Sequence, residues 1–272
     1  MINKYTLSLK EVLFKKIKKH VLRESTWVEF TGNFDTRHEA LLACQGGYED
    51  NKIFDKVSKA ALTVKSGQAN YERDGYLFYK EEIDLQLVEA FFEIYLNDKR
   101  FDLVDYGGSL GSAYFQNLKK LNFLGTYTWN VIEQKHFVDF GKDNLENEHL
   151  KFYYQLNDVR HTKYNCVLFG ASLQYIENYR EILDEIASNR INYIIVDRLT
   201  VCDEDRYCVQ RVYEPIYDAV YPVHVFSEEQ FCELLTTLGY NLEHSWIKNE
   251  RGYYVVGNKI IREKSFFWVR NI

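Results

Sequence analysis

The stretch that decides the fold is Phe101-Asp-Leu-Val-Asp-Tyr-Gly-Gly-Ser-Leu-Gly-Ser112. Its first residues are mostly apolar and predict a short buried strand over 101–106, and the segment after the glycines has the periodicity of a helix over 112–121. A strand, a tight glycine turn and a helix in this order are typical of the first unit of a doubly wound sheet, whose carboxyl edge binds nucleotide-type ligands. The stretch therefore predicts the fold class and the place of a ligand.

The chain beyond this stretch alternates predicted strands and helices. We expect strands at 128–133, 150–155, 166–170 and 193–197, helices at 176–187 and 228–238, and two closing strands at 241–247 and 253–260 that form a hairpin through 248–252. Short apolar strands separated by helices favour a parallel sheet. The prediction is an α/β, Rossmann-like, mainly parallel seven-stranded sheet with an antiparallel edge strand.

The first hundred residues have a different character. We interpret residues 26–98 as mostly helical, with a clear amphipathic helix over 81–96, and we expect a helical N-terminal domain at 1–98 followed by the main domain at 99–272. Residues 1–25 hold seven lysines and arginines against two glutamates, with apolar residues at helical spacing. This basic amphipathic helix either contacts an anionic membrane surface peripherally or docks its apolar stripe on its own protein.

Composition excludes several classes of protein. The chain has 272 residues, 46% of them hydrophobic, and a net charge of −6, which disfavours a nucleic-acid partner because phosphate binding needs a positive surface. We expect no transmembrane helix and no signal peptide, and therefore a cytoplasmic protein whose five cysteines are reduced thiols. We also expect no metal site, because Cys202 and Cys208 lack the spacing of zinc ligands.

The glycine turn allows several interpretations, which differ in the residues that they require. A dinucleotide site requires glycines at 109 and 112, where this chain has serines, and a phosphate-binding loop requires a Gly-Lys-Ser/Thr ending that is absent. A hydrolase would use Ser109 as the nucleophile of a Gly-x-Ser-x-Gly elbow. The pattern acidic-x-Gly-x-Ser-x-Gly instead resembles motif I of class I S-adenosylmethionine-dependent methyltransferases, with serine at the middle glycine.

This resemblance implies the cofactor S-adenosylmethionine, with S-adenosylhomocysteine as product, and a set of binding residues. Glu133 at the end of the next strand would accept the ribose hydroxyls, Asp158 or its neighbour Asn157 would meet the adenine amino group, and Ser172 would face the sulfonium. The cofactor-binding residues expected are Asp105, Gly107, Gly108, Ser109, Gly111, Glu133, Asp158 and Ser172.

A closer resemblance covers nearly the whole chain. It is to a family of bacterial methyltransferases often encoded among surface-polysaccharide genes, and it implies a cytoplasmic enzyme that methylates a small-molecule or glycan-precursor acceptor beneath an N-terminal lid. The matching stretches are WVEFTGNFDTRHEA (27–40), ANYERDGYLF (69–78), VDYGGSLGSAYFQN (104–117), WNVIEQKHFVDFG (129–141), LFGASLQYIENYREIL (168–183), IIVDRLTV (194–201) and AVYPVHVFSEEQF (219–231).

Candidate residues for the methyl acceptor come from later strand ends. A hydroxyl acceptor needs a general base, and we expect His224 to supply it from a loop at the ligand edge. An anionic acceptor would depend on Arg198 instead, with Gln174 or Tyr175 beside it. The polar cluster Tyr71-Glu-Arg-Asp74 is a further candidate for acceptor contact. A protein that keeps the fold as a binding or scaffolding module without catalysis is the alternative, and an NAD-dependent enzyme is disfavoured.

Overall fold

The fold is described by a computed structural model, which covers residues 27–44, 50–159, 163–216, 218–247, 253–257 and 259–271. The basic N-terminal helix expected at 1–25 lies outside the described residues, as does the connection at 248–252. No helix within the described ranges is long and apolar enough to cross a membrane.

Five parallel strands form the centre of the sheet, as the sequence predicts. They are β4 (Phe101–Tyr106), β5 (Tyr127–Ile132), β6 (Leu150–Tyr153), β7 (Cys166–Gly170) and β8 (Tyr193–Cys202), in the spatial order β6-β5-β4-β7-β8. Their residues alternate between two apolar clusters: Leu103 and Ile195 pack in one and Val104 and Ile194 in the other. Both faces are therefore buried, which is what a parallel sheet requires.

The closing strands are arranged differently from the prediction. β13 (Lys259–Arg270) pairs antiparallel with β8 and also with β11 (Tyr240–Ile247), while the short β12 (Tyr253–Val256) pairs only with β13. The expected hairpin between 241–247 and 253–260 is therefore wrong. The strand that lies antiparallel beside β8 is β13, and β11 and β12 lie on its outer side. Phe266, Phe267 and Trp268 of β13 are all buried. The long β13 therefore buries more apolar surface beside β8 than the short β12 would bury in the same place.

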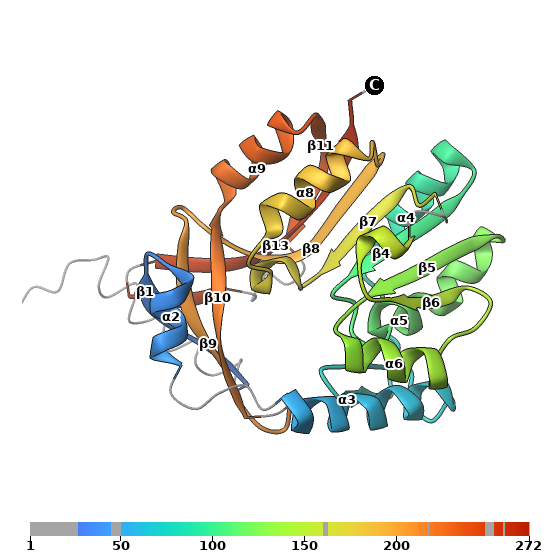
Figure 1. The fold of residues 1–272 in the computed structure, drawn as a ribbon, viewed down its shortest axis with the longest axis horizontal. Coiled ribbons are helices and arrows are strands. Elements are labelled where there is room, and N and C mark those ends of the chain that lie inside the picture. The colour runs from blue at the N-terminus through green and yellow to red at the C-terminus, as the bar shows by residue number, and fades with distance from the viewer. Residues whose placement is uncertain are drawn as a thin grey trace, which may run out of the picture.

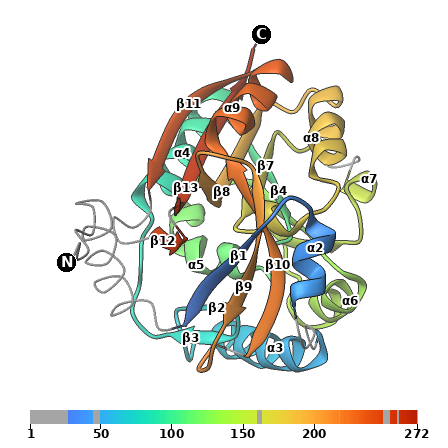
Figure 2. The ribbon, with the colours of Figure 1, turned by 90° about the vertical axis from the view of Figure 1, so that its left-hand side faces the viewer.

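The sheet has eleven strands in the described part of the chain, not seven: β13 is a separate strand, and three further strands extend the sheet beyond β8. β9 (Arg206–Val212) and β10 (Ala219–Ser227) form an antiparallel pair, and β10 pairs at its end with β8. β1 (Val28–Phe34) pairs with β9 on the outside. Figures 1 and 2 show these strands as an arm that leaves the central sheet. We call β1, β9 and β10 the arm.

Helices cover both faces of the central sheet (Figure 1). α4 (Leu85–Asp98), α5 (Ser112–Leu121) and α6 (Lys135–Asn144) contribute to one apolar cluster, and α7 (Leu156–Val159), α8 (Tyr179–Ser188) and α9 (Glu228–Thr237) contribute to the other. The amphipathic pattern read from the sequence explains the faces: Phe91 of α4 packs edge-on against Trp129 of β5.

The N-terminal part is less helical than expected. α2 (Arg37–Ala43) and α3 (Asp50–Lys65) are helices, but residues 28–34 form β1, and β2 (Tyr71–Arg73) pairs with β3 (Tyr76–Phe78) in a short hairpin. The helical interpretation of 26–98 is therefore wrong for residues 28–34 and for the hairpin at 71–78. α3 shares the apolar cluster of α4, α5 and α6. The division of the chain at residue 98 stays a prediction.

Candidate active site

The glycine turn between β4 and α5 is shaped by close approaches of polar side chains. Gly107 has φ +73°, and a Cβ atom there would lie 2.6 Å from Cβ of Ser172, while a Cβ on Gly108 would lie 2.5 Å from Cγ of Asp105. Ser109, at the middle position of the motif, adopts φ +53°, a left-handed conformation that favours glycine. The turn thus keeps the backbone conformation of a glycine-rich loop despite its serine.

Asp105 is a fully buried carboxylate beneath this turn. Its Oδ2 accepts a hydrogen bond from Nε1 of Trp129 at 3.0 Å, whereas its Oδ1 has no hydrogen-bond partner among the residues described. The pKa of Asp105 is raised to about 7, mainly by burial and also by the Glu133 and Asp197 carboxylates, against the opposing effects of Trp129 and Arg198. A ligand with a positive charge or an N–H group would satisfy the unpaired oxygen.

Glu133 joins the end of β5 to the glycine turn. The backbone N–H of Ser109 donates to its Oε1 at 3.3 Å, and the N–H of Gln134 donates to its Oε2 at 2.7 Å. α5 begins after Gly111 with no side-chain cap, so the first N–H groups of that helix are left for water or a ligand. The structure thus brings together Asp105, the turn and Glu133 at the carboxyl edge, in agreement with the predicted order of the strands.

Asp158 is not brought to these groups by any described contact. It lies exposed on α7, where its Oδ1 accepts a hydrogen bond from Nε2 of Gln155 at 3.2 Å. Its neighbour Asn157 is also exposed. The proposed adenine contact of either residue stays a prediction.

The segment after β7 and the end of β8 form the next part of the edge. The hydroxyl of Ser172 donates to the backbone carbonyl of Tyr106, and Nε2 of Gln174 donates to the carbonyl of Arg198 at 3.3 Å. Oε1 of the buried Gln174 has no partner among the described residues. The Tyr175 hydroxyl donates to Oε1 of Gln210 in the arm at 2.9 Å. Gln174 thus lies beside Arg198, while the acceptor role of these residues stays a prediction.

Arg198 is held by its preceding residue. Its Nε lies 3.0 Å from Oδ2 of Asp197, whose Oδ1 accepts from the Ser265 hydroxyl at 2.8 Å. Arg198 has φ +55°, and Ala171 has φ +59°. A left-handed conformation costs free energy in a non-glycine residue, and such residues are enriched at functional sites. Ser109, which has the same conformation, lies at the same edge of the sheet.

His224 does not occupy the expected loop at the ligand edge. It lies within β10, where it is 4% exposed, and its Nε2 is 2.9 Å from Oδ2 of Asp205. It pairs with Tyr207, three residues along the strand from the Tyr221–Gln210 pair. Because this separation is odd, its side chain is on the face of the arm opposite to Gln210. His224 is therefore not placed to act as the general base.

The β2–β3 hairpin reaches the same carboxyl edge. The Ser112 hydroxyl at the start of α5 donates to Oε1 of Glu72, and the N–H of Gly75 donates to its Oε2 at 2.9 Å. Glu72 is buried, and burial raises its pKa to about 7. Asp74, at the hairpin turn, is exposed and interacts electrostatically with Arg198.

Two further residues at this edge were missed by the sequence reading. Glu263 of β13 interacts electrostatically with Arg198, and the hydroxyl of Tyr254 in β12 donates to its Oε1 at 3.4 Å. Only the pairing of β13 with β8 brings them there, and the sequence reading expected a hairpin instead. We call Arg73, Asp74, Tyr175, Arg198, Tyr254 and Glu263 the acceptor cluster.

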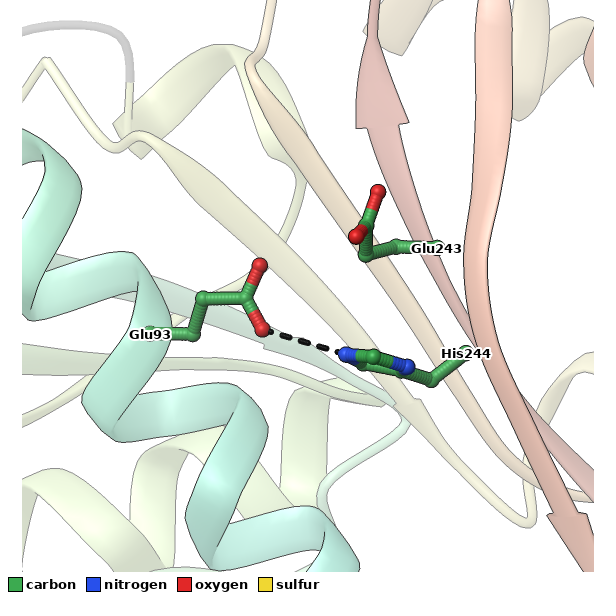
Figure 3. A group of neighbouring side chains, drawn as sticks. All are labelled: Glu93, Glu243 and His244. Carbon is green, nitrogen blue, oxygen red and sulfur yellow. Dashed lines mark hydrogen bonds and ion pairs between the residues drawn. The ribbon is translucent and has the colours of Figure 1, made fainter.

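Groups with metal-ligating chemistry lie elsewhere. Glu93 of α4 and the consecutive Glu243 and His244 of β11 have donor atoms within 4.8 Å of one another (Figure 3). A shift in strand register between Leu242 and His244 accompanies their arrangement. Nε2 of His244 lies 3.3 Å from Oε2 of Glu93, and both Glu243 and His244 are exposed, so a surface ion pair accounts for the group.

A cavity of about 620 Å³ also opens away from this edge. It lies between the end of β8, the start of α9 and the start of β13. Lys259 and Glu228 on its wall already form ion pairs with Asp203 and Lys264. None of the cofactor residues expected from the sequence lines it.

No model of a protein family and no curated protein matches the chain. Solved structures do. The N-terminal domain of EvdMO1 with bound S-adenosylhomocysteine is 13% identical at a TM-score of 0.47, covering 84% of this chain and all of that one. An S-adenosylmethionine-dependent methyltransferase from Clostridium acetobutylicum is 11% identical at 0.44, covering 71% and 94%. CalS10, an amino pentose methyltransferase from Micromonospora echinaspora, is 9% identical at 0.43, covering 68% and 90%.

Proposed function

We propose that this protein is an S-adenosylmethionine-dependent methyltransferase that methylates a hydroxyl group on a sugar or sugar-phosphate-type precursor of a surface polysaccharide. The observation that carries the cofactor assignment is the buried carboxylate of Asp105, whose Oδ1 lacks a partner among the described residues and lies directly beneath the glycine turn. The order of strand, turn and helix around it is that of a nucleotide-type site.

Charge distinguishes the ligand classes. A pyrophosphate or a terminal phosphate at this turn would lie over Asp105 and near Glu133 and Asp197. These three carboxylates repel one another, and they would repel a phosphate in the same way. S-adenosylmethionine carries an ammonium and a sulfonium and no phosphate, so the same carboxylates attract it. This favours a methyl donor over NAD or a nucleoside triphosphate.

The residues that fit this ligand are those of the turn and the two strand ends. Asp105 and the turn from Gly107 to Gly111 would hold its amino-acid part, and the Glu133 carboxylate would accept hydrogen bonds from its ribose. The bound ligand supplies a methyl group made electrophilic by a sulfonium sulfur. The contribution of the protein is then to place an acceptor oxygen in line with that group and to remove its proton.

The acceptor would bind at the acceptor cluster. Tyr175 is 37% exposed, the Arg198 side chain is 21% exposed, and Asp74 is exposed, so these polar groups are accessible to a hydroxyl-rich molecule. Tyrosine rings beside carboxylates and guanidinium groups suit a sugar, which has apolar C–H faces and many hydroxyls. The β2–β3 hairpin, which belongs to the N-terminal part of the chain, would cover the bound acceptor as a cap.

Calorimetric titration tests the cofactor assignment. The wild-type protein should bind S-adenosylhomocysteine and S-adenosylmethionine but not NAD, and Asp105→Asn should weaken this binding about 10–100-fold, the scale of losing one or two hydrogen bonds to a charged group. Glu93→Gln, at a half-buried position of α4 paired with His244 and outside the glycine turn, is the control and should bind like wild type. Binding of NAD alone would contradict the proposal.

A screen with nucleotide sugars tests the acceptor. Methylation adds one CH₂, and mass spectrometry detects the gain on UDP-glucose, UDP-galactose or UDP-N-acetylglucosamine. Tight binding of S-adenosylhomocysteine with no methylated product from any acceptor would support the alternative of a non-catalytic binding protein.

A further inference from the structure

The carboxyl edge contains several carboxylates, and their surroundings differ. Asp105 is fully buried beneath the turn, Glu133 accepts two backbone N–H groups, and Asp197 is bound by Arg198 and Ser265. Asp74 is exposed and accepts no hydrogen bond from the described residues. A general base must reach the acceptor and give its proton to water afterwards, and Asp74 meets both conditions.

The hairpin that carries Asp74 is held firmly. Its strands are joined by the stacked rings of Tyr71 and Phe78, whose centroids are 4.5 Å apart, and the Tyr71 hydroxyl donates to Oε2 of Glu82 at 2.5 Å. The guanidinium of Arg73 lies over both rings, at 5.8 and 5.7 Å from their centroids. With Glu72 bound to the start of α5, the turn residue Asp74 has a fixed place beside the cofactor loop.

Asp74 and Gly75 form the two-residue turn of the hairpin, with φ values of +53° and +76°, as a type I′ turn requires. This turn presents the Asp74 side chain at the tip of the hairpin. Loss of solvation of its carboxyl group beside the neighbouring elements raises the pKa of Asp74, and the charges of Arg198 and Arg73 oppose this effect only in part. Glu72 on the same hairpin and Tyr175 after β7 are the other titratable groups with which it interacts. A more basic carboxylate is a better proton acceptor at neutral pH.

We propose that Asp74 is the general base of the reaction and that the reacting group of the acceptor is a neutral hydroxyl, an inference that rests on the proposed methyltransferase function. As the oxygen forms its bond to the methyl carbon, the bond from that carbon to sulfur breaks and its electron pair stays on sulfur, which becomes a neutral thioether. The hydroxyl proton passes to the Asp74 carboxylate and then to solvent.

The charges of the acceptor cluster argue against an anionic reacting group. The charge of Arg198 is compensated by Asp197 at 3.0 Å, and Glu263 and Asp74 also act on it. A phosphate or carboxylate oxygen would therefore meet three carboxylates and a guanidinium that is already paired. Arg198 then positions Asp74 rather than binding an anion.

Asp74→Asn tests the inference, because asparagine tolerates the left-handed conformation and removes only the basicity. With S-adenosylmethionine and the nucleotide sugars named above, we expect kcat to fall about 10²–10⁴-fold while the affinity for S-adenosylhomocysteine stays unchanged. Wild-type kcat should fall toward acidic pH as Asp74 is protonated, and this limb should vanish in the variant. Asp203→Asn, an exposed carboxylate paired with Lys259, is the matched control and should keep full activity.

Each outcome separates the two proposals. An Asp74→Asn protein that methylates one of these sugars with the kcat of wild type would overturn the role of Asp74 alone. A wild-type protein that binds neither S-adenosylhomocysteine nor S-adenosylmethionine, or that binds them yet methylates none of these sugars, would instead defeat the sugar-methylating function, and the role of Asp74 with it.

Discussion

Gly107 is the residue on which the geometry of the cofactor turn depends most directly. Its φ of +73° and the 2.6 Å separation between its hypothetical Cβ and Cβ of Ser172 mean that an added methyl group is both strained and in collision. We expect Gly107→Ala to lower the free energy of unfolding by about 2–4 kcal/mol, measured by urea denaturation. Gly125→Ala is the matched control, since Gly125 has φ +72° but nothing within 4 Å of its Cβ. Its loss should be limited to about 1–2 kcal/mol of backbone strain. Equal losses in the two variants would show that the contact with Ser172 has no effect, whereas partial recovery in Gly107→Ala/Ser172→Gly would support it.

The β2–β3 hairpin is the element whose attachment responds to pH. Burial raises the pKa of Glu72 to about 7, above the ordinary value of 4.5, so the folded state binds a proton that the unfolded state releases between these values. The contribution of this group to stability is fully present below pH 4.5 and is lost as the pH rises through about 7. Glu72→Gln should therefore gain stability relative to wild type by about 1–3 kcal/mol between pH 5 and pH 8, measured by urea denaturation at each pH. Glu81→Gln, on the surface, should show no such gain in that range, because the ion pair with Lys120 lowers the pKa of Glu81. A constant difference between Glu72→Gln and wild type would contradict the proposed titration.

At the scale of the whole molecule, the arm closes back onto the N-terminal part. Figure 2 shows the β9–β10 end beside α3, and Nζ of Lys56 in α3 donates to the backbone carbonyls of Pro215 and Ile216 at that end. We expect Lys56→Met to increase hydrogen exchange in β9 and β10 about 5–30-fold, since losing hydrogen bonds to a charged donor costs about 1–2 kcal/mol, while α8 and α9 keep their protection. Lys59→Met, on the exposed side of the same helix, should leave exchange in the arm unchanged. Equal exchange in the Lys56→Met and Lys59→Met proteins would show that the arm does not depend on this contact.

Local patterns explain what the sequence determined by itself. The strand over 101–106, the helix over 112–121 and the strand over 166–170 have the predicted bounds, because each depends on apolar periodicity and on turn residues close in sequence. The convergence of Asp105, the glycine turn and Glu133 was also predictable. Parallel strands bring their carboxyl ends to one edge, so the order of strands along the chain already indicates which side chains meet.

Only the tertiary structure decided the acceptor side. Whether 253–256 pairs with β11 or with β13, and whether β9 and β10 extend the sheet, depends on which distant strand is available, and the local sequence is the same in either case. That choice moves His224 to the far face of the arm and brings Glu263 and Tyr254 to Arg198. The position of Asp74 likewise depends on a hydrogen bond between Glu72 and Ser112, forty residues apart in the chain. Pairings of this kind are selected by burial and long-range hydrogen bonding over the whole molecule, which no local pattern encodes.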